Sequence, residues 1–206
     1  LVKVLKGWDG NASADSSAYL VAGALRRKLR ERALATWHVE KWSGTISEDL
    51  TTELARAGAD AFPRAGLGSR ETFLRGCVEA ALADLAKRYG TDRAKWSWGD
   101  ANRMQVKHPL GRIPGLGWIF NPPALRQSGG GSVVKASSPA YGQSMRFILD
   151  WGAPEAATLV VPFGVSGHVG SPHRLDQLPF WHAGDPAGEA TRLARPAVGT
   201  LLEFKP

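Results

Sequence analysis

The sequence predicts an α+β protein with a helical front half and a strand-rich back half. Apolar residues recur at helical spacing before residue 95, whereas short alternating or continuous apolar runs follow residue 131. Glycine and proline recur between these parts, which favours a long irregular segment. We therefore expect a single segment, 1–206, that is mainly helical over 1–95, an irregular loop over 96–131 and mainly strands over 132–206.

The first helix is expected to begin at Asp15 or Ser16, which are good N-cap residues, and to run to about residue 34. It contains a dense basic run at residues 26–32. Most of these basic residues lie off the apolar stripe of the helix, so we expect them on a solvated face. The stripe consists of Ala18, Ala22, Leu25, Leu29 and Ala33.

Two further helices are expected before residue 95. A short one begins at Ser47, where Glu48 and Asp49 place negative charge at the positive end of the helix dipole, and ends near residue 58. Ser69 caps a longer helix, and Gly90 supplies the residue that ends it. The apolar positions of this longer helix are Leu74, Val78, Ala81, Leu85 and Tyr89.

Four strands are expected in the back part. Residues 144–151 alternate, which places Met145, Phe147, Leu149 and Trp151 on one face. Residues 157–163 are almost continuously apolar, which is typical of a strand that is covered on both faces. The remaining two strands are expected at 133–137 and 200–205.

Composition and charge limit the classes of function. With 206 residues, 43% of them hydrophobic, the chain can form a real core, and no apolar run approaches the length of a bilayer span. We therefore expect no membrane partner. The formal net charge of +7 suggests an anionic partner, but no aromatic residue interrupts the basic run as single-strand binding would favour. Nucleic acid is thus unlikely, and a basic module that binds polyanions is kept as the alternative function.

Cys77 is the single cysteine of the chain. It cannot form an intrachain disulfide or belong to a cysteine-cluster metal site. Its position between apolar residues of the third helix predicts a small buried side chain.

Residues 164–182 gather three of the five histidines around two serines and an aspartate. A nucleophile elbow is disfavoured, because His168 stands where the last glycine of that motif belongs and no helix is expected to follow. A local Ser-His-Asp triad is also disfavoured, because its three residue types can share a short loop by chance. A tight loop in which serine and histidine satisfy backbone groups is the favoured interpretation, with a substrate-lining role second.

A metal site in the same stretch would use His168, His173, Asp176 and His182. Four, two and five residues lie between successive members of this set, which matches neither one face of a helix nor one face of a strand. We therefore expect no metal in this stretch, and a self-contained metallohydrolase is the weakest hypothesis.

Ordered motifs across the chain resemble the C-terminal part of the β-chain of penicillin acylase (penicillin amidase) enzymes, in the N-terminal-nucleophile hydrolase superfamily. Their order and spacing are more specific than any one of them. The motifs are Trp8-Asp9-Gly10, Trp96-Ser97-Trp98-Gly99, His108-Pro109-Leu110-Gly111, Gly129-Gly130-Gly131, Ser144-Met145-Arg146-Phe147-Ile148-Leu149-Asp150, Gly164-Val165-Ser166-Gly167, Ser171-Pro172-His173 and Asp176-Gln177.

The resemblance implies the C-terminal portion of a four-layer αββα sandwich. It also implies hydrolysis of a linear amide in an N-acyl substrate, such as a β-lactam or an acyl-homoserine lactone. The nucleophile would be an N-terminal serine whose own α-amino group acts as the base, and an asparagine would help to form the oxyanion hole. These residues, and the ligands of a possible Ca²⁺, lie upstream in the family, so no catalytic residue and no cofactor site is expected in this chain. Alone, it should be inactive.

The resemblance leaves candidates for pocket or loop roles in this chain: Ser166, His168, His173, Asp176 and Trp181. Two local departures from the family are Arg174, where an aromatic residue is frequent, and residues 100–103, where a histidine is frequent. The implied partners are the α-chain and the N-terminal part of the β-chain, and the implied location is periplasmic or secreted. A sheet taken from a larger sandwich should expose strand edges and an apolar face.

Overall fold

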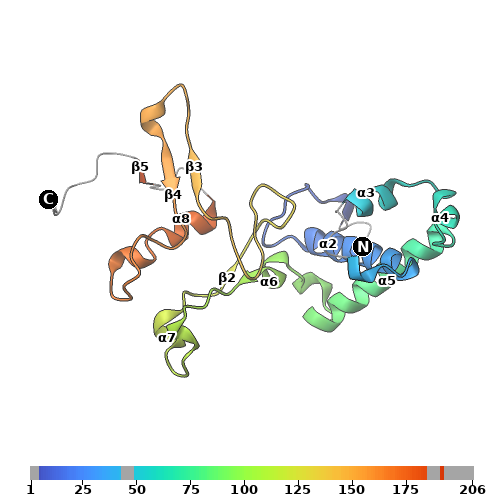
Figure 1. Cartoon of the computed structure of the whole chain (residues 1–206), viewed down its shortest axis with the longest axis horizontal. Coiled ribbons are helices and arrows are strands. Elements are labelled where there is room, and N and C mark those ends of the chain that lie inside the picture. The colour runs from blue at the N-terminus through green and yellow to red at the C-terminus, as the bar shows by residue number, and fades with distance from the viewer. Residues whose placement is uncertain (1–4, 43–48, 185–190, 193–206) are drawn as a thin grey trace, which may run out of the picture. The chain divides into compact units, whose positions relative to one another are not determined.

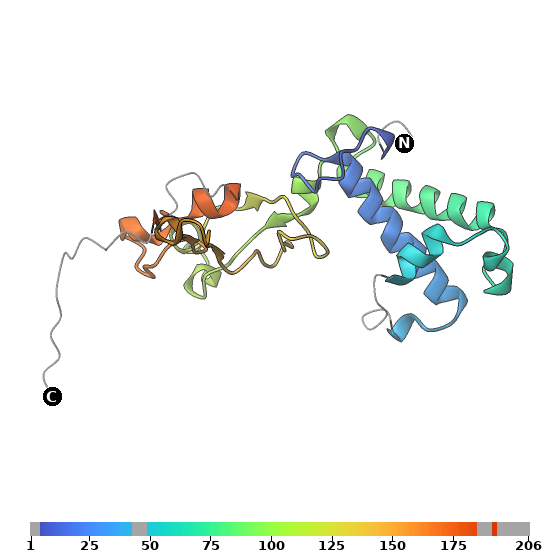
Figure 2. The same cartoon turned by 90° about the horizontal axis from the view of Figure 1, so that it is seen from above.

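The computed structural model describes residues 5–42, 49–184 and 191–192, and the chain divides into two compact units, Leu1–Asn102 and Arg103–Pro206 (Figure 1, Figure 2). Unit 1 is helical, and unit 2 combines short strands with short helices. The predicted α+β class is confirmed at this level, although helix predominates over strand.

Unit 1 is built on two long helices, α2 and α5, which pack against each other (Figure 2). Ser16 Oγ accepts a hydrogen bond from the Tyr19 backbone N–H (3.0 Å), and Ser69 Oγ accepts one from the Thr72 N–H (3.2 Å). Gly90 ends α5 at φ 85°. Both long helices and their caps are therefore confirmed. The helices of unit 1 are α2 Ser17–Thr36, α3 Asp49–Arg56, α4 Ala61–Arg64, α5 Arg70–Tyr89 and α6 Trp98–Ala101, with 3-10 turns η1 Glu40–Trp42 and η2 Arg93–Lys95.

The short second helix is present as α3, and the predicted starting residues Ser47 and Glu48 lie outside the described residues. On α5 the buried line is shifted from the predicted stripe. Leu74 and Val78 are only half-buried, because the face that α5 turns toward α2 is centred on the preceding positions. The fully buried residues, four positions apart, are Phe73, Cys77, Ala81 and Leu85.

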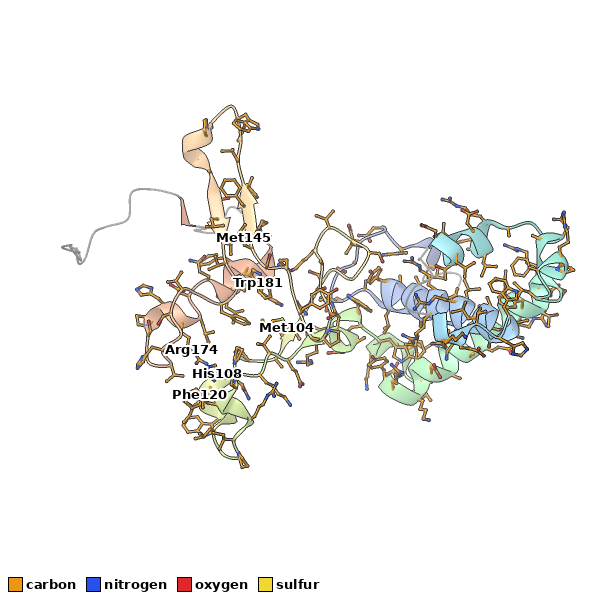
Figure 3. All side chains as sticks on the ribbon, viewed as in Figure 1. Met104, His108, Phe120, Met145, Arg174 and Trp181 are labelled. Carbon is orange, nitrogen blue, oxygen red and sulfur yellow. The ribbon has the colours of Figure 1, made fainter. Side chains whose placement is uncertain are left out.

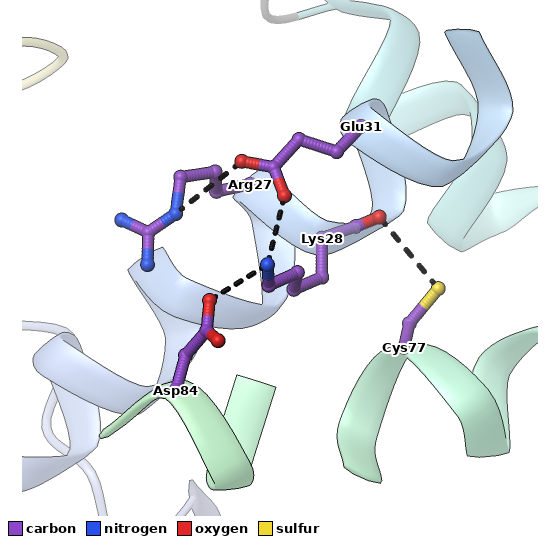
Figure 4. A network of polar contacts seen from close by, with 5 residues as sticks. All are labelled: Arg27, Lys28, Glu31, Cys77 and Asp84. Carbon is purple, nitrogen blue, oxygen red and sulfur yellow. Dashed lines mark hydrogen bonds and ion pairs between the residues drawn. The ribbon is translucent and has the colours of Figure 1, made fainter. Parts of the chain in front are cut away.

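The basic run on α2 is partly tied to α5 (Figure 4). Lys28 Nζ lies 2.7 Å from an Asp84 carboxylate oxygen and 3.0 Å from a Glu31 carboxylate oxygen, and Arg27 Nε lies 3.7 Å from Glu31. The hydrogen bond to Asp84, then that to Glu31, raises the pKa of Lys28, and the bond from Lys28 lowers the pKa of Asp84. The run is therefore not simply a solvated face.

Cys77 lies beneath this network, with 1% of its surface exposed and its Sγ 3.8 Å from the Lys28 carbonyl oxygen (Figure 4). Burial is the main cause that raises the pKa of its thiol. The prediction of a buried cysteine is confirmed, and the thiol is unreactive for the same reason.

Unit 2 has two small antiparallel sheets. One pairs β1 with β2, and the other has the described order β3-β4-β5, with Arg146 opposite Val160 and Ile148 opposite Thr158. Its core contains Met104, Val160 and Trp181. The elements are β1 Arg103–Met104, η3 Leu110–Arg112, α7 Gly117–Phe120, β2 Leu125–Arg126, β3 Arg146–Ile148, η4 Pro154–Ala156, β4 Thr158–Val160, η5 Pro172–Arg174, α8 Leu178–Ala183 and β5 Thr191–Arg192.

Two strand predictions are corrected. Residues 133–135 form bends and 136–137 are irregular, because Gly129 at φ 88° turns the chain back so that the Gly130 N–H donates to the Lys135 carbonyl (3.0 Å), and Val134 is left fully exposed. The run 157–163 forms a strand only over β4, where Val160 is buried and Leu159 is half-buried, so it is not covered on both faces. The predicted strand 200–205 lies outside the described residues.

The strand predicted over 144–151 is confirmed only at its centre, as β3. Its expected apolar face does not point into the core, since Met145 and Phe147 are both more than half exposed. In the described ranges, no helix combines the length and the apolar character that a membrane span requires.

The Lys28–Asp84 pair should stabilise unit 1 over a defined range of pH. The pKa of Asp84 is lowered on folding, so its contribution is present above the ordinary value of 3.8 and is lost as the pH falls through the folded value. The pKa of Lys28 is raised, so its contribution is present below 10.5 and is lost as the pH rises through the folded value. We expect Asp84→Asn to lower the thermal midpoint near neutral pH, and the difference from wild type to disappear in acid.

The control for this substitution is Glu79→Gln, which removes an exposed carboxylate from the same helix. Thermal melts followed by circular dichroism would check both variants, and added salt should shrink the effect of Asp84→Asn by screening the pair. An equal loss at acidic and neutral pH would show that the effect is not electrostatic.

Candidate functional site

Unit 2 has a hollow of about 290 Å³. Two stretches line it, one between β1 and β2 and the other after β4. Its walls are mostly apolar, and three polar side chains reach them: His108, Ser166 and Arg174. The apolar residues that line it are Val106, Phe120, Pro122, Pro162, Phe163, Val165 and Leu175.

His108 is fixed on one wall by three contacts. Its ring stacks on Phe120, with the centroids 5.3 Å apart, and its backbone N–H donates to Asn121 Oδ1 (2.9 Å). The Leu110 N–H donates to His108 Nδ1 (3.1 Å), which assigns the proton of the neutral ring to Nε2. The imidazole is thus held in one orientation, and its Nε2–H takes no part in these three contacts.

Arg174 joins the two walls of the hollow (Figure 3). Its guanidinium donates to the Ile119 carbonyl (3.2 Å) and to the Phe120 carbonyl at the end of α7. Terminal carbonyls of a helix have no partner within the helix, and a cation is favoured beside them. Arg174 therefore acts as a clamp between residues 119–120 and the loop after β4.

The loop after β4 leaves the strand through a strained residue. Phe163 has φ 64°, a left-handed conformation that is costly for an aromatic residue. It packs near Trp181, with ring centroids 5.9 Å apart, and its carbonyl accepts the Gln177 N–H (2.8 Å). These contacts hold the sharp exit that turns the chain toward the hollow.

Gly164 follows at a point of close approach. A Cβ atom there would lie 2.3 Å from the His173 carbonyl oxygen and 2.6 Å from Asp176 Oδ1. The next turn is closed by the Ser166 N–H, which donates to the same His173 carbonyl (3.1 Å). The glycine in this motif is therefore required by packing between the two ends of the loop.

His173 and Asp176 form an exposed pair at the outer side of the loop. His173 Nδ1 lies 2.9 Å from Asp176 Oδ2. This arrangement can orient an imidazole, as the carboxylate does in acid–base catalysis. However, the Ser166 hydroxyl accepts a hydrogen bond from the His168 backbone N–H (3.2 Å), and no contact in the described residues joins it to an imidazole. The nearby Ser171 hydroxyl accepts the His173 backbone N–H (3.2 Å), so the loop brings a His–Asp pair together without a hydroxyl hydrogen-bonded to its imidazole in the described residues.

The remaining candidates from the sequence are dispersed. His168 is exposed and its Nδ1 accepts the Gly170 N–H (3.2 Å) within its own turn. Trp181 is buried in the core of unit 2 and its indole N–H donates to the Gln143 carbonyl (2.9 Å). His182 Nε2 lies 2.8 Å from the Arg126 carbonyl. In the part of the chain that the structure describes, no three His, Cys, Asp or Glu residues are grouped to hold a metal ion.

Two cations lie at the end of α8. Lys135 Nζ donates to the His182 carbonyl (2.6 Å) and to Ser128 Oγ (3.0 Å), and Arg146 donates to the Phe180 carbonyl (3.4 Å). Burial, and then the charge of Arg146, lower the pKa of Lys135. These groups tie the base of β3 and the 128–135 turn to α8.

Ser166, a pocket or loop candidate from the sequence, lines the hollow, whereas no role there is predicted for His108, Phe120 or Phe163. His108 belongs to a quoted motif, but its stacking on Phe120 joins positions twelve apart in an irregular segment and has no periodic signal. The strain at Phe163 is also invisible in the sequence, because neighbouring contacts rather than residue type impose a positive φ there.

The amino-acid sequence of the chain matches a known protein family. The family model described as penicillin amidase matches residues 1–188. The chain is 26% identical, over 193 residues, to the penicillin acylase 2 proenzyme of Pseudomonas sp. (strain SE83), covering 88% of this chain and 25% of that protein. It is 27% identical, over 135 residues, to the acyl-homoserine lactone acylase QuiP of Pseudomonas aeruginosa, covering 56% of this chain and 16% of that protein. The chain therefore spans a quarter or less of the length of these relatives.

A single methyl group at position 164 should disrupt the loop. Gly164→Ala places its Cβ against the His173 carbonyl and Asp176, and we expect a loss of about 1–3 kcal/mol in the free energy of unfolding, as for other overpacked sites. Gly167→Ala is the matched control, because no atom lies within 4 Å of its Cβ. Urea unfolding would measure both; equal stability of the two variants would contradict the close approach.

Proposed function

Since the chain belongs to the penicillin amidase family, whose members hydrolyse amide bonds, we propose that it is the C-terminal scaffold of an acylase. The enzyme would cleave a linear amide in an N-acyl substrate, and the nucleophile would be an N-terminal serine on a different part of the enzyme. The observation that carries this proposal is the family match, which extends over residues 1–188.

The proposed chemistry is acyl transfer. A serine hydroxyl attacks the amide carbonyl once a base removes its proton, and preset hydrogen-bond donors stabilise the oxyanion. The geometry of unit 2 favours a structural role for this chain in the reaction over a catalytic one. The Ser166 and Ser171 hydroxyls each accept a backbone N–H, and within the described residues no hydrogen bond joins either hydroxyl to the His173 imidazole.

The hollow beside His108 and Arg174 is proposed as part of a pocket rim rather than as the catalytic centre. An N-acyl substrate combines an apolar acyl group with polar amide and amine parts. Aromatic and aliphatic walls with a few oriented polar groups suit such a ligand. Ser166, His168, His173 and Asp176 are assigned to this rim or to its loop, and Trp181 to the core beneath it.

The substrate class is proposed from the two relatives. One is named for penicillin and the other for acyl-homoserine lactones, and both of these are N-acyl compounds. The α-chain and the N-terminal part of the β-chain are the proposed partners. Any Ca²⁺ would be bound by residues upstream. A periplasmic or secreted location remains a prediction from the family resemblance.

The net charge of +7 motivates the alternative of a module that binds polyanions. Arg27 and Lys28, at the centre of the basic run, are engaged by Glu31 and Asp84. These internal ion pairs weaken the alternative, because the carboxylates already neutralise much of the local charge.

The proposed function predicts that the purified 206-residue chain hydrolyses neither an N-acyl β-lactam nor an N-acyl-homoserine lactone. Activity should appear when the chain is joined by the polypeptide encoded immediately upstream in the source genome. It should then disappear when the N-terminal serine of that polypeptide is changed to alanine. Release of the free amine would measure turnover, and hydrolysis by the chain alone, in proportion to its concentration, would refute the proposal.

A further inference from the structure

The β3–β4 hairpin exposes a group of large apolar side chains, which we call the hairpin surface. The exposed fractions on one face are 60% for Met145, 51% for Phe147 and 85% for Trp151, and Ile148, on the opposite face of β3, is 41% exposed. All four lie within seven consecutive residues, in and just beside β3. Single exposed apolar residues are ordinary on protein surfaces, whereas a contiguous group that includes a tryptophan marks a site of interaction.

The strand that carries this surface is also an edge strand. In the described sheet order β3-β4-β5, β3 has a neighbour on one side only. Natural edges are protected from pairing by charges, proline or bulges. Between residues 145 and 149 the only charged residue is Arg146, and its guanidinium turns toward the Phe180 carbonyl of α8 (3.4 Å). The edge is therefore left open for pairing.

The base of the hairpin is held firmly while its apolar surface remains uncovered. Val160, opposite Arg146, is 1% exposed in the core of unit 2. Gln143, just before β3, donates to the Trp181 carbonyl (3.1 Å) and accepts the Trp181 indole N–H at its own carbonyl (2.9 Å). Figure 1 shows the hairpin extending away from α8. A fixed base presents the strand in a defined direction, which lowers the entropic cost of binding.

We propose that the hairpin surface is covered by the polypeptide that forms the rest of the acylase, with one of its strands added to the free edge of β3. This inference rests on the proposed function. The hairpin lies within residues 1–188, which match the penicillin amidase family, and the chain corresponds to only 25% of the length of the Pseudomonas sp. relative. In that relative, three-quarters of the protein lies outside the matched region and is available to cover the surface.

A second copy of this chain could also pair through an open edge, and the same relatives argue against it. When two partners belong to one polypeptide or one processed precursor, the effective concentration of each near the other is high. The remainder of the enzyme would then occupy the edge before another copy could do so. We therefore assign the hairpin surface to the remaining polypeptide of the acylase and not to a second copy of the chain.

Binding between the 206-residue chain and the polypeptide encoded immediately upstream tests this assignment. We expect Phe147→Lys and Trp151→Lys each to weaken binding by at least about tenfold, as for residues at the centre of an interface. The matched control is Trp118→Lys, since Trp118 is 82% exposed on α7, which Figure 1 separates from the hairpin. The control should change the affinity by less than about twofold. If Phe147→Lys or Trp151→Lys has a lower thermal midpoint than Trp118→Lys, Met145→Lys is used in place of that variant.

Thiol labelling gives an independent readout. Cys77 is buried, so the thiol of Phe147→Cys would be the accessible one in the folded chain, and the wild-type chain reports the background. We expect a maleimide to label Phe147→Cys at least about tenfold more slowly after the upstream polypeptide is added, because the interface core excludes solvent.

The outcomes separate this inference from the proposed function. If amidase activity is restored but the lysine variants bind normally and labelling is unchanged, docking occurs elsewhere and this inference alone fails. If the chain instead forms a dimer that Phe147→Lys and Trp151→Lys dissociate, the occupant is a second copy and the inference is overturned. If neither binding nor activity appears, both this inference and the proposed function fail.

Discussion

Unit 2 depends on the burial of Trp181. The side chain is 2% exposed and contacts two parts of the chain that are distant in sequence. Its indole N–H donates to the Gln143 carbonyl, its ring lies near Phe163, and its ring atoms come so close to Gly142 that a Cβ there would lie 2.5 Å away. One aromatic residue on a short helix thus fixes the base of the hairpin at residues 142–143 and the exit of β4. A unit with so few buried residues needs such a centre, because large aromatic side chains bury the most apolar area.

Polar contacts also join the segments of unit 2, in addition to its small apolar core. Helices as short as α7 and α8 leave most of their carbonyl oxygens without an internal partner. Arg174 donates to the last carbonyls of α7, and Lys135 and Arg146 donate to those of α8. Each of these cations comes from a segment distant in sequence, so satisfying a helix end also joins two segments. This explains how an irregular chain can hold a defined hollow between residues 106–122 and 162–175.

Local signals in the sequence predicted the parts of the fold that depend on local interactions. Ser16 and Ser69 cap α2 and α5 by contacts within three residues, and Gly90 ends α5 through its own backbone conformation. The strand predictions that failed depended on which segment packs against a residue, which the sequence alone does not show. The run at 133–137 has strand composition, but strand formation needs a neighbouring strand, and the glycines before it direct the chain into a turn instead. Apolar composition likewise cannot distinguish burial in the core from exposure at an interface.

The candidate site divides in the same way. His173 and Asp176 are three positions apart, and their pairing follows from proximity along one turn. One wall of the hollow is formed by His108 and Phe120, which are placed by contacts with Asn121 and Arg174. No spacing rule connects residue 108 with residue 174. Motif order across the whole chain indicated the family, whereas the individual positions in the hollow required coordinates.

The strands raise a final point about the predicted sandwich. Stacked sheets lie about 10 Å apart and bury the inner face of each, so a strand in the middle of a sandwich should be covered. Of the six residues of β3 and β4, only Val160 is buried, although most of the others are apolar. An apolar strand that its own unit does not cover is energetically costly when it is exposed to water. The four-layer arrangement, if formed with the rest of an acylase, would remove that cost by burying the same residues. The proposed sandwich would therefore account for the exposed face of β3.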